Sequence, residues 1–173
     1  AYYNLPIKAP GEAKISVEIH WSIAQERQSP DVPGLFERAQ RAPEPAEGAK
    51  LFSPVDLLLH QSLHHAYHFF QPRLAWVQDI ALLHRDGVDL DEATRRARAW
   101  GMQVPLALSC LQVEKVYPGV LAADWLEWAR SVRRARWMAG TFASDSPVEI
   151  LGKWKGRRRQ LVYALLMLDR PTQ

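Results

Sequence analysis

The sequence of 173 residues contains one cysteine, Cys110, which excludes an internal disulfide bond. This cysteine lies in the apolar run 106–111, where a free thiol usually packs as a small core residue. Apolar runs such as 161–168 are much shorter than the roughly 20 residues that a membrane span needs, and no charged-then-apolar signal opens the chain. We therefore expect a cytoplasmic protein that does not enter a membrane.

Several catalytic signatures are also missing, namely a glycine-rich phosphate loop, a CxxC pair and a GxSxG nucleophile turn. A net charge of +3 is too small to mark a dedicated nucleic-acid-binding protein. With 47% hydrophobic and 24% charged residues, the composition is that of a globular domain with one substantial core. Taken alone, the sequence supports no complete active site.

Local patterns predict strands first and helices afterwards. Strict alternation over 14–21 predicts a half-buried strand, whereas the opening residues 1–3 show no strand or helix start. A short helix at 35–41 and a short strand at 50–52, pairing near the first strand, should follow. Further helices are expected at 54–70, 72–85, 89–100, 104–117, 122–138 and 157–169. The fold class is therefore α+β and mainly helical, with a small β-sheet remnant in 1–52 and a bundle of about six helices in 53–173.

The polar face of the first predicted strand carries Glu18 and His20, since alternate residues share a side of a strand. A carboxylate there suits Mg²⁺, which prefers oxygen ligands. The same alternation occurs on any half-exposed strand, so the pattern by itself favours a plain solvated face.

The helix predicted at 54–70 carries His60, His64 and His68 four residues apart on one stripe, with His65 beside them. Histidines at this spacing can share a metal ion. Gln61 stands where the zinc protease motif has glutamate, and the spacing supplies too few ligands, so zinc on this helix is not expected. The alternative is that these histidines are partly buried and hydrogen-bond to neighbouring helices.

The C-terminal third is locally basic, although Asp145 and Glu149 lie within it. Its cations are Arg130, Arg133, Arg134, Arg136, Lys153, Lys155, Arg157, Arg158 and Arg159. Together with Trp137 and Trp154 they are typical of surfaces that follow phosphates. The alternative, which the pattern favours, is a solvated helix face with both tryptophans packed inward.

Four segments together resemble a known family. They are 17–21 (VEIHW), 51–60 (LFSPVDLLLH), 64–68 (HHAYH) and 73–80 (RLAWVQDI). These segments resemble the uncharacterised bacterial nucleotidyltransferase family, which is similar in fold to the DNA polymerase β superfamily. The resemblance covers residues 15–85 well and 159–172 more loosely.

The resemblance implies transfer of a nucleoside monophosphate from a nucleoside triphosphate to an unknown acceptor, with Mg²⁺ as cofactor. Glu18 falls where the family has its third metal-binding carboxylate, usually an aspartate. The family's Gly-Ser turn and paired aspartates are absent. We therefore expect a C-terminal portion of a longer protein, or a degenerate relative, that is inactive as an isolated chain, because one carboxylate cannot hold two metal ions and a phosphate.

The resemblance gives the histidine helix and residues 76–79 a role without saying which one. Our hypothesis is that His60, His64 and His68 pack or hydrogen-bond beneath the substrate cleft, and that Asp79 fixes a neighbouring helix. The residues expected to bind the nucleotide are His20, His64, His68 and Asp79. The alternative is a noncatalytic helical module that binds a protein or, through the basic C-terminal third, a nucleic acid. A third option is a metal-binding protein built on the histidine helix.

Overall fold

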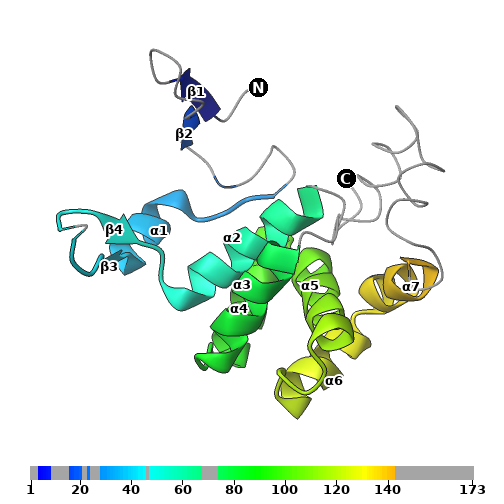
Figure 1. Ribbon diagram of the computed structural model, residues 1–173. Helices are drawn as coiled ribbons and strands as arrows, with labels where there is room; N and C mark the ends of the chain where they lie inside the picture. The colour runs from blue at the N-terminus through cyan, green and yellow to red at the C-terminus, as the bar shows by residue number, and fades with distance from the viewer. Residues whose placement is uncertain are drawn as a thin grey trace.

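The protein is described here by a computed structural model, which describes residues 4–8, 16–20, 23, 28–45, 47–67 and 74–142. In this part of the chain the strands are β1 (Asn4–Lys8), β2 (Ser16–His20), β3 (Gln40–Arg41) and β4 (Lys50–Leu51). The helices are α1 (Val32–Arg38), α2 (Pro54–Tyr67), α3 (Leu74–Arg85), α4 (Leu90–Trp100), α5 (Gln103–Val116), α6 (Ala123–Ser131) and α7 (Arg133–Phe142) (Figure 1). The α+β, mainly helical class is confirmed.

The first strand pair is antiparallel. In its register Pro6 of β1 lies opposite Glu18 of β2, and Asn4 lies opposite His20. The strand predicted around residues 14–21 is confirmed, whereas β1 was not predicted from the sequence. Pro6 argues against a strand in the sequence, because proline cannot donate a backbone hydrogen bond. It is tolerated here because both strands of a two-stranded sheet are edge strands.

The second strand pair is a separate sheet. β4 pairs with β3, in the register Gln40↔Leu51, and not with the first strands as predicted. The reason is that α1 begins and ends earlier than expected. The Asp31 carboxylate caps it by accepting the Gly34 N–H at 3.0 Å, and the helix ends at Arg38, which leaves residues 40–41 extended for pairing.

The bundle is built around α5, which packs against α2, α3, α4, α6 and α7. Every residue from Val104 to Cys110 is buried, so this stretch of the helix is covered on all sides, as expected of a central helix. The expected burial of Cys110 is confirmed. The last two helices of the described residues, α6 and α7, both pack against α5, and in Figure 1 α7 lies beside α5 on the side away from α2. Within the described residues, none of the helices has both the length and the apolar character of a membrane span.

The helix predicted at 122–138 is in fact two helices. Val132 adopts an extended backbone, with φ −74° and ψ 92°, and separates α6 from α7. The Ser131 hydroxyl donates to the Trp128 carbonyl at 2.7 Å, a local bond that competes with the helical pattern. The break makes Arg133 the first residue of a new helix. The helix predicted at 157–169 lies outside the described residues.

Candidate functional site

The strand residues singled out by the sequence are both in β2. Glu18 and His20 are two positions apart, opposite Pro6 and Asn4 of β1. The structure describes the backbone of this strand and not its side chains, so the shared polar face stays a prediction. Their roles in metal and nucleotide binding likewise stay predictions.

The histidine helix is α2, and its rings form a row with two other aromatic residues. The ring centroids of Phe52 and His60 are 5.5 Å apart, and those of His60 and His64 are 6.2 Å apart. The His64 ring meets Trp76 of α3 edge to face, with centroids 4.9 Å apart and an interplanar angle of 80°. His64 is half-buried, so one side of its ring packs in the interface between α2 and α3.

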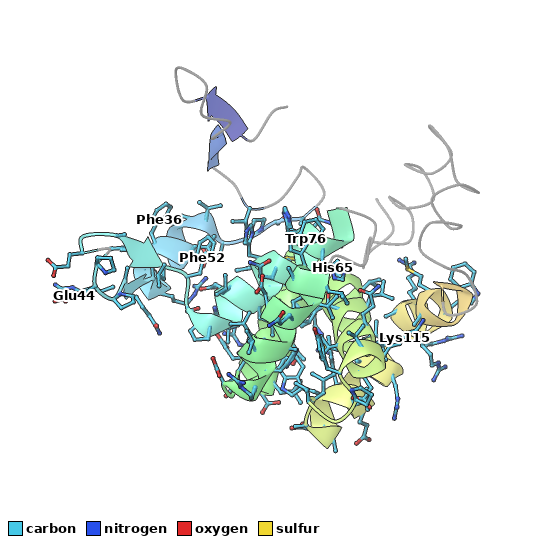
Figure 2. The ribbon with its side chains drawn as sticks, viewed as in Figure 1. Phe36, Glu44, Phe52, His65, Trp76 and Lys115 are labelled. Atoms are coloured by element: carbon cyan, nitrogen blue, oxygen red, sulfur yellow. The ribbon has the colours of Figure 1, made fainter. Side chains whose placement is uncertain are left out.

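His65 lies deeper than its neighbour. It is fully buried, and its ring lies 6.2 Å from Trp76 (Figure 2). His68 lies outside the described residues. Among the residues that the structure does describe, no three histidine, cysteine or acidic side chains gather closely enough to hold a metal ion.

Asp79 is exposed on α3. Its side chain makes no hydrogen bond or ion pair with any other described residue, so this part of the chain offers no partner for the helix-fixing role expected of it. An exposed carboxylate remains accessible to a ligand.

A buried ionic cluster, missed from the sequence, centres on Asp56. The Asp56 side chain is fully buried in α2. The backbone N–H of Asp56 donates to Ser53 Oγ at 3.2 Å, and the Ser53 hydroxyl donates to Oδ2 of Asp56 at 2.7 Å. Arg38 of α1 donates to both carboxylate oxygens, at 3.0 and 3.3 Å. Arg96 of α4 donates to Oδ1 at 2.5 Å. One carboxylate thus joins three helices.

The outer members of this cluster balance its charge. Asp31 accepts from Arg38 at 3.2 Å, and Glu92 accepts from Arg96 Nε at 2.8 Å. The hydrogen bond to Asp56 raises the pKa of Arg38. The Gly34 N–H lowers the pKa of Asp31, and the hydrogen bond from Arg95 lowers the pKa of Glu92. Because every charge is met by an opposite one, we assign the cluster to structure and not to substrate binding.

A second charged site lies where α4, α5, α6 and α7 meet, and its described lining contains arginines but no acidic residue. We call it the arginine groove, a hollow of about 400 Å³ lined by Arg98, Gln103, Trp128, Ser131, Arg133 and Arg134. The sequence analysis identified Arg133 and Arg134. It missed Arg98, because Arg98 and Arg133 are 35 positions apart and no local signal indicates that they share a site.

An adjoining hollow of about 910 Å³ continues along α7. Among the described residues it is lined by Arg133, Arg134, Arg136, Trp137 and Gly140. Trp137 is 60% exposed, so the favoured prediction that it packs inward was wrong. The buried residues of α7 are instead Ala135 and Met138. Trp154 lies outside the described residues.

The residues that could hold Mg²⁺ do not make a complete site in the described part of the chain. Glu18 has the oxygen donors that Mg²⁺ prefers, but no described group of three potential ligands gathers around one point. An in-line displacement at phosphorus usually places metal ions on both the attacking and the leaving oxygen.

Comparison with known proteins gives one match. A family model described as an uncharacterised nucleotidyltransferase matches residues 2–118, from β1 to the end of α5. No curated protein and no solved structure matches the chain.

Proposed function

Because this chain belongs to the uncharacterised nucleotidyltransferase family, we propose that the protein transfers a nucleoside monophosphate from a nucleoside triphosphate to an acceptor. In this reaction an acceptor oxygen attacks the α-phosphorus, the bond from that phosphorus to pyrophosphate breaks, and the acceptor loses a proton. The observation that carries the proposal is the family match over residues 2–118, which includes Glu18, His64 and Asp79.

We assign Glu18 the role of a metal-facing carboxylate. Mg²⁺, when bound, neutralises negative charge on the triphosphate. Glutamate is longer than the aspartate usual at this position by about one methylene, a difference that changes how a carboxylate meets the octahedral geometry of Mg²⁺. A single carboxylate can bind one Mg²⁺ together with water and substrate phosphates, whereas an arrangement of two metal ions requires further carboxylates.

The nucleotide itself is proposed to contact His20, His64, His68 and Asp79. His64 offers a half-buried imidazole held against Trp76, so its orientation is restricted before any ligand binds. Asp79, one turn of α3 after Trp76, offers an exposed carboxylate suited to a ribose hydroxyl. Trp76, which contacts His64, lies three residues before Asp79 on α3, and this supports placing His64 and Asp79 at one edge of the cleft.

Nucleotide binding tests this proposal. Calorimetry with each of the four nucleoside triphosphates, in Mg²⁺ and then in a chelator, should show binding that requires Mg²⁺. Glu18→Gln keeps nearly the same size and removes the charge, and we expect it to weaken Mg²⁺-dependent binding about tenfold, whereas Glu37→Gln on the exposed face of α1 should bind as the native protein does. Equal binding by both variants would remove Glu18 from the site. Absence of nucleotide binding in the native protein would favour the noncatalytic binding module.

A further inference from the structure

We propose that the arginine groove binds the phosphate backbone of a single-stranded nucleic acid. Resting on the proposed function, this assigns the acceptor to the class of nucleic acids. Two helices far apart in sequence supply the cations, Arg98 at the end of α4 and Arg133 with Arg134 at the start of α7.

Two arginines of the groove, Arg98 and Arg133, differ from the neighbouring arginines on α4 in having no acidic partner among the described residues. Arg95 and Arg96 both bind Glu92, and Arg96 also binds Asp56. Within the described residues, Arg98, Arg133 and Arg136 form no ion pair. Like charges such as those of Arg98 and Arg133 repel one another when they lie in one groove, and an anionic ligand reduces that repulsion.

The shape of the site fits a chain of phosphates better than a single one. The arginine groove and the adjoining hollow share Arg133 and Arg134, so the basic surface continues around the start of α7. From Arg133 to Gly140 the helix rises about 10 Å, at roughly 1.5 Å per residue. Successive phosphates of a strand advance about 3.4 Å along a duplex axis, so this surface reaches more than one phosphate.

An exposed aromatic ring makes a single strand the better ligand. Trp137 is 60% exposed and lies four residues after Arg133, which places both on one face of α7. Proteins that bind single strands combine a basic groove with aromatic rings on which unpaired bases stack. In a duplex the faces of the bases are covered by neighbouring bases, so the Trp137 ring could not stack on them.

The test measures binding without nucleotide or Mg²⁺. Fluorescence anisotropy with a single-stranded RNA of about 16 nucleotides, with the matching DNA strand and with the duplex would rank the three ligands. We expect the single strands to bind more tightly than the duplex, with affinity that falls steeply as salt rises. The slope of log affinity against log salt should lose about 0.7 for each phosphate contact removed.

Matched variants separate the groove from general positive charge. Arg98→Ala and the double variant Arg133→Ala with Arg134→Ala should each weaken binding, the double by about tenfold, and lower the salt slope. Arg95→Ala removes an equally charged, exposed side chain of α4 outside the groove and should change binding little. If Arg95→Ala weakens binding as much as Arg98→Ala, the assignment of the groove is overturned.

Two aromatic variants test the stacking. Trp137→Ala should weaken single-strand binding about tenfold, whereas Phe36→Ala, which removes a ring that is 67% exposed on α1, should not. Tighter binding of duplex than of single strand would also contradict the proposal. Since these measurements omit nucleotide, failure here leaves Mg²⁺-dependent nucleotide binding intact, and failure of nucleotide binding leaves the groove intact.

Discussion

Nη1 of Arg96 donates to Oδ1 of Asp56 at 2.5 Å, across 40 positions of sequence. The Asp56 side chain is fully buried and that of Arg96 is 11% exposed, so water cannot replace either partner. The contact ties α4 to α2, and Arg38 ties α1 to the same carboxylate. The orientation of the first half of the bundle therefore depends on one acidic side chain.

Loss of the Asp56 charge should be severely destabilising. Asp56→Asn leaves Arg38 and Arg96 facing each other in a buried site, so we expect the free energy of unfolding to fall by about 3–5 kcal/mol. Urea denaturation followed by circular dichroism measures it. The control is Asp86→Asn, which removes a carboxylate 3.8 Å from Arg85 in a pair that is about 70% exposed on both sides and should cost less than about 1 kcal/mol. Equal small losses in both variants would contradict this account of the cluster.

Stability should fall in mild acid because of His84. Burial lowers the pKa of this imidazole from 6.5 to about 4, and its ring packs against Trp125 with its Nε2 atom 3.7 Å from Cys110 Sγ. Between pH 6.5 and pH 4 the unfolded chain binds a proton that the folded protein does not, so acid favours unfolding. The total loss across this window is about 3 kcal/mol.

Urea denaturation at pH 7 and pH 5 measures this effect. His84→Phe keeps a ring beside Trp125 and cannot titrate, so the variant should lose less stability than the native protein between these two pH values. The other histidines are common to both proteins and cancel in the comparison. The same pH dependence in both proteins would show that His84 is not the responsible group.

Cys110 should be unreactive while the protein is folded. The thiol is fully buried in α5, and burial raises its pKa, so the reactive thiolate is scarce at neutral pH. Iodoacetamide at pH 8 should leave the native protein unmodified, as shown by intact mass, and should add one label in denaturing urea. Rapid labelling without denaturant would mean that the core around α5 opens easily.

Local signals in the sequence predicted the bounds of α2 and α4 well. Ser53 and Pro54 mark the start of α2, and α4 is bounded by the Asp89 cap, which accepts the Glu92 N–H at 2.7 Å, and by Gly101 with φ 69°. Each signal acts within a few residues, so it can be recognised without knowing the fold. The division into residues 1–52 and 53–173 stays a prediction.

Contacts between distant segments were not predictable in this way. Asp56 has the sequence context of a helix cap, and nothing near it indicates that Arg38 and Arg96 will meet it. The arginine groove depends on the approach of Arg98 from another helix and on the break at Val132, which makes Arg133 the first residue of α7. The sequence therefore indicated a basic region, whereas the structure defines the groove.

The most direct measurement of the central claim follows the two ends of the triphosphate separately. The native, full-length protein is given nucleoside triphosphates labelled at the α-phosphorus or at the γ-phosphorus, with Mg²⁺ and an RNA extract as acceptor. Nucleotidyl transfer predicts that the α-label alone becomes attached to the acceptor, that pyrophosphate is released, and that Glu18→Gln abolishes both. Attachment of the γ-label, or of neither label by the native protein, would contradict the proposed function.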